Sequence, residues 1–253
     1  MRSIRARNSS GTPAPVSGQP PALASPVIMN QDWRDLTFLH WTADPQLLER
    51  FMPPGAHPDT FEGRSYVGLI PFRMVDAGLG RGPGVPWAGT FLETNVRLYS
   101  VDETGRRGIV FLSLDTDRSI IVAGARLAFG LPYRWARMRY AETSEGVHRY
   151  ETRLRWPAAR VTSRITIRAG APRKATALDE FLTARWGLHV RHLGRTRYVP
   201  NAHPPWPLRD AEVIELDDGL MRSVGLGNLG SRPPDHVAFS EGVHTEFGLP
   251  ERI

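Results

Sequence analysis

Short runs of β-branched, aromatic and aliphatic residues, separated by turn residues, are the feature that most constrains this chain. The 253 residues include 24 Gly and 22 Pro, which interrupt helical periodicity too often for an all-helical bundle. Many short strands with turns at fairly regular intervals predict an antiparallel sheet system that closes into a barrel or a sandwich. The expected strands are Phe38–Trp41, Ser65–Met74, Phe91–Val101, Ile109–Asp115, Tyr133–Ala141, His148–Trp156, Arg160–Ala169, His189–Tyr198, Ala211–Leu216 and Leu220–Gly225.

Few segments have helical character. Asp44 is placed to cap a short helix that ends before Pro53. The spacing of apolar residues predicts a longer helix over Ala175–Trp186, which Gly187 ends. Ser119–Phe129 opens with β-branched residues, but its alanines favour a helix. The expected fold class is therefore α+β, mainly antiparallel β with a few short helices.

Composition limits the class of protein. With 41% hydrophobic and 23% charged residues the chain is in the globular range. The absence of cysteine excludes disulfides, thiolate zinc sites and cysteine nucleophiles, and it fits a reducing compartment such as the cytoplasm. No stretch approaches the roughly 20 apolar residues of a membrane span, so no membrane partner is expected.

The first 28 residues differ from the rest. They consist mainly of Arg, Ser, Gly, Pro and Ala without apolar periodicity, and we expect a disordered tail over residues 1–28. Prolines interrupt any apolar run that a secretory signal would need. Met29 stands where the globular pattern begins, which suggests a real or alternative translation start there. Residues 29–253 are expected to form a single domain.

Arginine carries nearly all of the positive charge. Lys174 is the only lysine among 32 basic residues, and the formal net charge is +6. Such a charge is compatible with a nucleic-acid partner. The arginines are spread along the chain among acidic residues, however, which favours an ordinary solvated surface. Nucleic-acid binding is therefore not expected.

The segment Phe91–Tyr99 carries polar residues at every second position. The period of a strand places Glu93, Asn95 and Arg97 on one face, with aromatic residues at both ends. An acid, an amide and a base form a candidate ligand surface, because they supply both charges and orientation. The alternative is a water-facing strand with a local ion pair worth about 0–1 kcal/mol.

The next expected strand repeats this alternation. Ile109, Phe111, Ser113 and Asp115 are expected to share one face. Asp115 ends the strand, where aspartate commonly makes a turn. A ligand role is therefore less strongly indicated for Asp115 than for Glu93.

The eight histidines do not form a metal motif. They are scattered, and His189 and His192 would point to opposite faces of a strand. His40, beside Trp41 and after apolar residues, is typical of a histidine in the core or at the edge of a pocket. Neither a metal nor a cofactor is expected.

Several separated motifs carry a family resemblance. They are Asp35–Trp41, Val67–Met74, Phe91–Arg97, Phe111–Asp115, Ala125–Arg126, Leu131–Tyr133, Ala136–Met138 and His203–Leu208. With these motifs the chain resembles the YqjF-like family of uncharacterised bacterial proteins over nearly all of Met29–Gly248. That family is in turn similar to acetoacetate decarboxylase, which implies a β-barrel with a small-molecule pocket in its mouth or interior.

The resemblance does not extend to the decarboxylase lysines. In acetoacetate decarboxylase a Gly-Arg-Glu element leads into Pro-Lys-Lys, where one lysine forms a Schiff base and its cationic neighbour depresses its pKa. Here Gly124–Arg126 leads into Pro132, Tyr133 and Arg134. Neither a guanidinium nor a phenol can form the imine, and Lys174 is expected to be exposed and charged. Schiff-base decarboxylation is therefore not expected.

The resemblance does imply a pocket lined by polar residues. Glu93 and Tyr133 would handle protons as the catalytic pair, while Arg97 and Arg126 would hold a substrate carboxylate by bidentate pairing. Arg126 has an alternative role in an internal ion pair with Glu93 or Asp115. One water-poor cavity is predicted to contain all four of these side chains, those of Glu93, Tyr133, Arg97 and Arg126. The remaining candidate substrate-binding residues are Asn95, Asp115 and His40.

Two functions remain open. The first is a cofactor-independent enzyme acting on a small carboxylate- or carbonyl-bearing molecule. The second is a non-catalytic protein that binds or senses such a molecule in the same cavity. The expected partner in both is a small-molecule ligand, and the exposed aromatic strands are compatible with a homo-oligomer.

Overall fold

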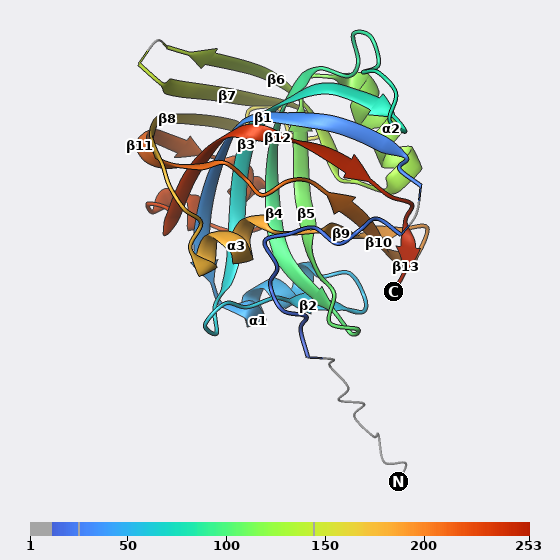
Figure 1. Cartoon of the computed structure of the whole chain (residues 1–253). Coiled ribbons are helices and arrows are strands. Elements are labelled where there is room, and N and C mark those ends of the chain that lie inside the picture. Colours follow the sequence, from blue (N-terminus) through green and yellow to red (C-terminus); the bar gives the residue numbers. More distant parts are fainter. Residues whose placement is uncertain (1–11, 25, 144) are drawn as a thin grey trace.

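The computed structural model describes residues 12–24, 26–143 and 145–253, which consist mainly of strands with few helices (Figure 1). The strands are β1 (Met29–Ala43), β2 (Ala56–Pro58), β3 (Ser65–Leu79), β4 (Phe91–Asp102), β5 (Arg107–Thr116), β6 (Tyr133–Glu142), β7 (Val147–Trp156), β8 (Thr162–Pro172), β9 (Gly187–His192), β10 (Arg195–Ala202), β11 (Leu208–Asp218), β12 (His236–Phe247) and β13 (Glu251–Arg252). The helices are α1 (Pro45–Leu48), α2 (Ser119–Phe129), α3 (Ala177–Thr183) and α4 (Leu220–Ser223), with 3₁₀ turns at Glu49–Phe51 and Leu229–Ser231.

All of these strands belong to one sheet. Their order is β13-β10-β9-β5-β6-β7-β8-β11-β12-β1-β3-β4-β2. Neighbouring strands are antiparallel except that β5 runs parallel to both β6 and β9. The expected α+β class with a mainly antiparallel sheet is therefore confirmed.

Two further pairings return the sheet on itself: β4 pairs with β5, and β10 pairs with β12. One closed circuit of pairing runs through β5, β6, β7, β8, β11, β12, β1, β3 and β4. A second circuit runs through β5, β9, β10, β12, β1, β3 and β4. The strands common to both circuits, β12, β1, β3, β4 and β5, form what we call the shared wall.

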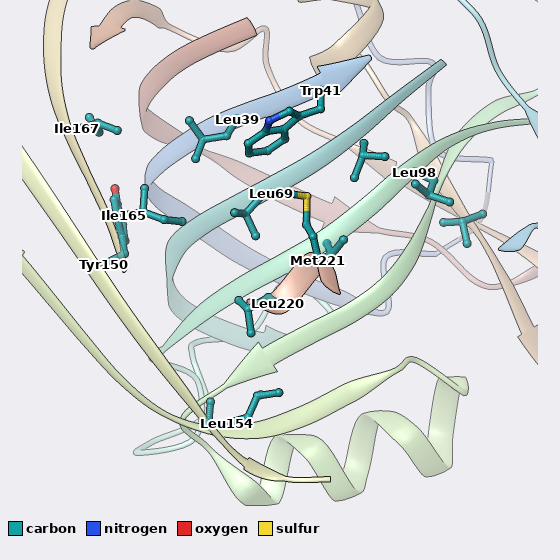
Figure 2. Close-up of a cluster of buried hydrophobic side chains, with 14 of the residues drawn as sticks. Leu39, Trp41, Leu69, Leu98, Tyr150, Leu154, Ile165, Ile167, Leu220 and Met221 are labelled. Atoms are coloured by element: carbon teal, nitrogen blue, oxygen red, sulfur yellow. The ribbon is translucent and has the colours of Figure 1, made fainter. Parts of the chain in front are cut away.

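One face of the shared wall packs into the main hydrophobic core inside the first circuit (Figure 2). Leu69 of β3 and Leu98 of β4 are fully buried there together with Ile165 of β8. Met221 of α4 is buried in the same cluster. Each such side chain contributes about 1.5–3 kcal/mol by leaving water, so this core fixes the position of the wall.

Two expected strands are wrong in detail. His189–Tyr198 is divided into β9 and β10 by Leu193 and Gly194, whose φ angles are 48° and 76°. Two positive φ angles in succession form the tight turn that hairpins favour. Leu220–Gly225 is not a strand, because the Asp218 carboxylate accepts hydrogen bonds from the first backbone N–H groups of α4.

The expected helices are confirmed with adjusted ends. Asp44 caps α1 by accepting from the Gln46 backbone N–H at 2.9 Å. Ser119–Phe129 is helical as favoured, and Gly130 ends it in the left-handed conformation. The helix expected over Ala175–Trp186 is limited to Ala177–Thr183, after a capping box at Thr176. No helix of the described part of the chain is both long and apolar enough to cross a membrane.

The segment before β1 carries no helix or strand where it is described. Residues 1–11 and 25, which belong to the predicted tail, lie outside the described residues. The Ala14 backbone N–H donates to the Gly105 carbonyl at 2.8 Å, and the Trp186 indole N–H donates to the Ser17 carbonyl at 3.0 Å. Regular structure begins at Met29, the first residue of β1.

Candidate functional site

A cavity of about 100 Å³ lies within the second circuit, on the opposite face of the shared wall from the main core. It is somewhat smaller than the roughly 150 Å³ apolar cavity that accepts benzene, so its size suits a small organic molecule. Most lining residues are apolar and come from strands of the second circuit. The lining residues from other segments are Ile28, Phe129, Leu131, Tyr133 and Trp206. The polar lining residues are Gln31, Glu93, Asn95, Arg97 and Tyr133.

Strand β4 supplies three of these polar side chains by simple alternation. Glu93, Asn95 and Arg97 line the cavity, whereas Val96 and Leu98 between and beyond them belong to the main core. The structure therefore places the three residues on one face, as the alternation of the sequence predicted. Glu93 and Asn95 are buried, which distinguishes this face from the water-facing alternative.

The expected alternation in β5 is wrong because of a β-bulge. Arg97 pairs with Phe111 and Val96 pairs with Ser113, so Leu112 is an extra residue opposite β4. Ile109 and Phe111 line the cavity before the bulge, and Leu114 lines it afterwards. The bulge thus turns Ser113, and with it Asp115, away from the cavity.

Asp115 instead forms a buried ion pair with Arg134. Its carboxylate oxygens accept from Arg134 Nε and, at 2.7 Å, from a terminal guanidinium nitrogen. Arg134 also donates to Ser113 Oγ at 3.1 Å and Ser223 Oγ at 2.8 Å. Burial raises the pKa of Asp115 while the Arg134 charge opposes this rise. The Arg134 guanidinium, which follows Pro132 and Tyr133 in the segment matched to the decarboxylase lysines, is therefore paired with Asp115.

Glu93 and Tyr133 meet inside the cavity. The Tyr133 hydroxyl donates to a Glu93 carboxylate oxygen at 2.9 Å, and both side chains are buried. Burial raises the pKa of Glu93 to about 8, the Asp115 charge adds to the rise, and the hydrogen bonds from Tyr133 and Asn95 oppose it. Burial and the Glu93 charge raise the pKa of Tyr133 well above its usual value. Glu93 therefore titrates close to neutral pH, as a general acid or base requires.

Two polar atoms at the cavity lack a protein partner. Asn95 Oδ1 and the Trp33 indole N–H are buried, and neither forms a hydrogen bond within the described part of the chain. An unpaired buried polar group costs about 1–3 kcal/mol. A ligand that donates to Asn95 and accepts from Trp33 would remove both penalties. Sequence patterns alone do not single out Trp33, whose only signal is its position at the start of the globular pattern.

Arg97 is held by the protein at two of its three nitrogens. Its Nε donates to the Tyr99 hydroxyl at 3.2 Å, and a terminal nitrogen donates to the Leu182 carbonyl at 3.0 Å. Its guanidinium carbon also lies 5.8 Å from the centre of the Phe38 ring. These contacts fix the cation at the cavity wall.

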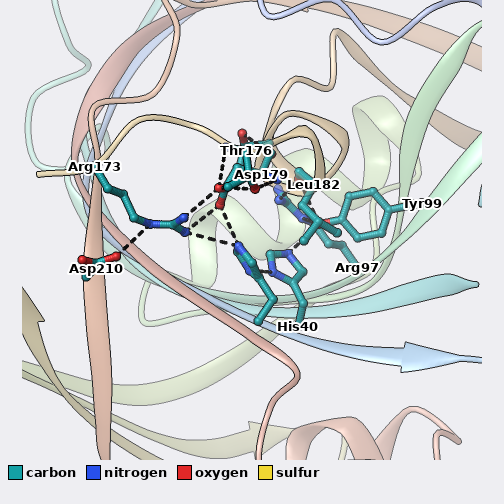
Figure 3. A network of polar contacts seen from close by, with 10 residues as sticks. His40, Arg97, Tyr99, Arg173, Thr176, Asp179, Leu182 and Asp210 are labelled. Atoms are coloured by element: carbon teal, nitrogen blue, oxygen red, sulfur yellow. Dashed lines mark hydrogen bonds and ion pairs between the residues drawn. The ribbon is translucent and has the colours of Figure 1, made fainter. Parts of the chain in front are cut away.

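His40 lies behind Arg97 in a buried polar network, rather than in the cavity lining (Figure 3). Its Nε2 is 2.7 Å from the Tyr99 hydroxyl, and its Nδ1 is 2.9 Å from His236 Nδ1. His236 Nε2 is in turn 2.7 Å from an Asp179 carboxylate oxygen. Burial lowers the pKa of His40 well below its usual value, and the charges of His236 and Arg97 lower it further.

Two hydrogen bonds in this network have a direction fixed by their acceptors. Burial would raise the pKa of Asp179, but hydrogen bonds from His236, Thr176 and Arg173 outweigh burial and lower it, so Asp179 is a carboxylate that accepts from His236 Nε2–H. The Tyr99 hydroxyl donates its proton to the Leu182 carbonyl at 3.0 Å, and the same carbonyl accepts from Arg97. His40 thus contacts Arg97 through Tyr99.

Arg126 does not reach the cavity, so the expectation that one cavity holds Glu93, Tyr133, Arg97 and Arg126 is wrong for this residue. Arg126 is exposed on α2, and donates to the Tyr133 backbone carbonyl at 2.7 Å. Its alternative ion pair with Glu93 or Asp115 is also absent, because Arg134 pairs with Asp115. Arg126 follows Val122 by one turn on the same side of α2, but its long side chain extends to the Tyr133 carbonyl outside the cavity.

One group of side chains has metal-ligand chemistry among the described residues. Potential ligand atoms of Asp35, Glu142 and His148 lie within 4.8 Å of one another. Arg73 already donates to Asp35 at 2.8 Å, and the Tyr140 hydroxyl lies 2.9 Å from His148 Nδ1. The residues come from β1, β6 and β7, so sequence spacing could not indicate this group. The Tyr140 hydroxyl also donates to Glu142 at 3.5 Å, so all three members of the group have protein partners.

Comparisons with solved structures agree on the fold. An acetoacetate decarboxylase-like enzyme from Sphingomonas wittichii RW1 is similar with a TM-score of 0.62 and 13% identity, covering 89% of this chain and 92% of that one. Acetoacetate decarboxylase from Legionella pneumophila gives a TM-score of 0.59 and 14% identity over 100% and 98% of the two chains. The enduracididine biosynthesis enzyme MppR complexed with pyruvate gives 0.56 and 16% over 90% of each. The expected likeness to acetoacetate decarboxylase is therefore confirmed as a likeness of fold.

Sequence comparisons identify the family. The chain is 33% identical over 217 residues to the uncharacterized protein YqjF of Bacillus subtilis (strain 168), covering 85% of this chain and 89% of that protein. Residues 30–244 match the model of the family DUF2071, described as an uncharacterized conserved protein. The resemblance seen in the sequence motifs is thus confirmed, and the chain belongs to the DUF2071 family together with YqjF.

Proposed function

We propose that this protein binds a small carbonyl- or carboxylate-bearing molecule in its cavity and moves a proton on it through Glu93. The observation that carries the proposal is the buried Glu93–Tyr133 hydrogen bond of 2.9 Å in a cavity where Asn95 Oδ1 and the Trp33 N–H have no protein partner. The two closed circuits of strand pairing support a β-barrel as the enclosure of this cavity. We further propose that residues 29–253 act as one domain in a reducing cytoplasm, since the chain has no cysteine.

The proposed step is removal of a proton from the carbon next to a ligand carbonyl. The Glu93 carboxylate takes the proton, the C–H electron pair forms the enolate double bond, and negative charge moves to the carbonyl oxygen. The Trp33 N–H and the Arg97 guanidinium are the donors available to that oxygen. Tyr133 orients the Glu93 carboxyl by its hydrogen bond. A pKa of Glu93 raised to about 8 makes it a stronger base than an ordinary carboxylate.

The chemistry differs from imine formation. Lys174, the only lysine, is exposed and lies outside the cavity lining. Tyr133 and Arg134 stand in the region where the decarboxylase has its lysines, and Arg134 is paired with Asp115. The proposed step proceeds without a Schiff base and requires no cofactor. MppR, which shares the fold, has been solved with pyruvate, and this supports a small oxo acid as the ligand class to test.

The experiment is hydrogen–deuterium exchange of pyruvate methyl protons in D₂O, followed by proton NMR. Wild type is expected to accelerate exchange, and Glu93→Gln is expected to abolish the acceleration because the amide cannot accept the proton. Glu212→Gln is the matched control, since Glu212 is exposed on β11 and lies outside the cavity lining. Exchange that persists in Glu93→Gln would refute the proposed role of Glu93.

A non-catalytic binding function is the second candidate, favoured by the unpartnered Asn95 and Trp33 atoms. A thermal-shift screen of small oxo acids and ketones distinguishes the two. A ligand at a hundredfold excess over its Kd stabilises the native state by about 2.7 kcal/mol. A shift that Asn95→Ala removes, without proton exchange, would indicate binding alone. No shift and no exchange with any compound would refute both functions.

A further inference from the structure

Helix α2 presents an apolar face to solvent. Ile120, Ala123, Gly124 and Leu127 are spaced i, i+3, i+4 and i+7, so they share one side of the helix, and all four are exposed. Ile120 is 55% exposed and Leu127 is 80% exposed. Val122 on the other side is buried. A surface helix ordinarily has the opposite arrangement, with polar residues outward.

Exposed tryptophans flank this helix, and each is stacked with an arginine. At the start of α2 the Arg118 guanidinium lies 5.4 Å from the Trp87 ring centre, and in its last turn Arg126 lies 4.8 Å from Trp156. Trp156 pairs across the sheet with Trp135, over which Arg155 lies at 5.2 Å. The tryptophans Trp87, Trp156 and Trp135 are 72%, 47% and 37% exposed.

The arginines of this surface have no acidic partner. Within the described residues, Arg118, Arg126 and Arg155 form no ion pair with a carboxylate. Asp117, next to Arg118, accepts from the Leu92 backbone N–H at 3.2 Å. Farther along β6 and β7, Arg137 and Arg153 stand directly opposite each other, again without an ion pair among described residues. Like charges directly opposite each other are destabilising. An external anion bound beside them would reduce this repulsion.

We propose that this surface docks on an anionic lipid bilayer. The α2 face comprises Ile120, Ala123, Gly124 and Leu127 of the helix, the tryptophans Trp87, Trp135 and Trp156, and the arginines Arg118, Arg126 and Arg155. Apolar and indole side chains enter the interfacial region, while the guanidinium groups reach the headgroup phosphates. The contact is peripheral, and it concerns a different face of the molecule from the cavity proposed above.

Charge decides between a bilayer and a second copy of the chain. A two-fold dimer through this face would place the same patch on itself and bring unpaired arginines against arginines. An anionic leaflet supplies the complementary charge along the whole surface. Tryptophan and arginine are also residues that suit the boundary between water and hydrocarbon, because each has an apolar body and a polar end.

The experiment is co-sedimentation of the full chain with vesicles of phosphatidylcholine alone or with about one third phosphatidylglycerol. We expect binding only to the anionic vesicles, and its loss at about 1 M salt, where the Debye length is about 3 Å. The variant R126Q/R155Q should bind roughly 25-fold more weakly, since each cation near such a surface contributes a factor of about five. The variant I120S/L127S should also lose binding. Leu193→Ser, which alters an 88% exposed residue in the β9–β10 turn, is the matched control and should bind normally.

Several outcomes would overturn the proposal. Equal binding to neutral and anionic vesicles would exclude recognition by charge, and no binding to either would exclude a lipid partner. Loss of binding in Leu193→Ser as large as in I120S/L127S would exclude this face. Sedimentation equilibrium showing a dimer in wild type and a monomer in I120S/L127S would assign the face to a second copy. The variants alter exposed residues, and unchanged circular dichroism is required of each before vesicles are added.

Discussion

The Nδ1 atoms of His40 and His236 lie 2.9 Å apart, so a single proton joins the two rings. On either side of this contact, His236 Nε2 donates to the Asp179 carboxylate and His40 Nε2 lies 2.7 Å from the Tyr99 hydroxyl. The arrangement transmits the position of the Asp179 carboxylate through two imidazoles and the Tyr99 hydroxyl to Arg97 at the cavity.

Replacing His236 should destabilise the fold. His236→Phe keeps a ring but leaves the buried His40 Nδ1 without its hydrogen-bond partner, and we expect a loss of about 1–3 kcal/mol in the free energy of unfolding. Urea denaturation measures the change. His57→Phe is the control, because the His57 side chain is about half exposed, and it should change the value by less than about 0.5 kcal/mol. Equal losses in the two variants would contradict the network.

Glu93 should make stability fall as pH rises. Burial raises the pKa of Glu93 from 4.5 to about 8, so between these values the native state keeps a proton that the unfolded state releases. The stabilisation is complete below about pH 4.5 and is lost as pH approaches 8, with a total on the order of a few kcal/mol. Urea midpoints of wild type and Glu93→Gln at several pH values test this. A constant difference between them across this range would mean that Glu93 is already ionised in the native protein.

His203 should have the opposite effect. Burial lowers the pKa of His203 from 6.5 to about 4, while the Pro204 carbonyl opposes the change. Between pH 6.5 and pH 4, His203 binds a proton in the unfolded state but not in the native state. The free energy of unfolding therefore falls by about 1.4 kcal/mol per pH unit as the pH is lowered through this range. His203→Asn should lack this component of the acid dependence in chemical denaturation. An identical acid slope in the variant would show that His203 accepts a proton in the fold.

Breaking the Asp115–Arg134 pair should cost far more than breaking a surface pair. Arg134→Met leaves the Asp115 carboxylate buried without its cation, and we expect a loss of about 3–5 kcal/mol in stability. Arg164→Met breaks the exposed pair with Glu215 and should cost about 0–1 kcal/mol. Thermal or urea unfolding of both variants gives the comparison. A small loss in Arg134→Met would indicate that Asp115 is protonated in the native state.

The sequence predicted the strand-rich fold and the grouping on β4, because both depend on local alternation of side chains. Glu93, Asn95 and Arg97 follow the strand period without interruption. Their meeting with Tyr133 was expected only from the family resemblance, since these segments come together through the parallel pairing of β5 with β6. Local patterns carry no information on such a pairing.

The errors have physical causes. The bulge at Leu112 has no Gly or Pro to signal it, so the expectation for Asp115 failed by one residue. Gly194 did mark the turn that divides His189–Tyr198, but the expected strand was continued through it. Strand β12 was missed because charged and polar residues alternate through it, and Gly242 with a φ of 125° interrupts the pattern. Arg126 was assigned to the cavity from the family resemblance alone, and in the structure its side chain donates to the Tyr133 carbonyl instead.

The shared wall also has a consequence for how such a protein can diversify. Its strands β1, β3, β4 and β5 each give some side chains to the main core and others, on the opposite face, to the cavity. Substitutions at cavity-facing positions can therefore change the shape of the cavity while the side chains in the main core preserve the fold. Relatives with the same scaffold are free to differ in what they accept, and divergence in selectivity should concentrate in cavity-facing positions such as Asn95 and Leu114.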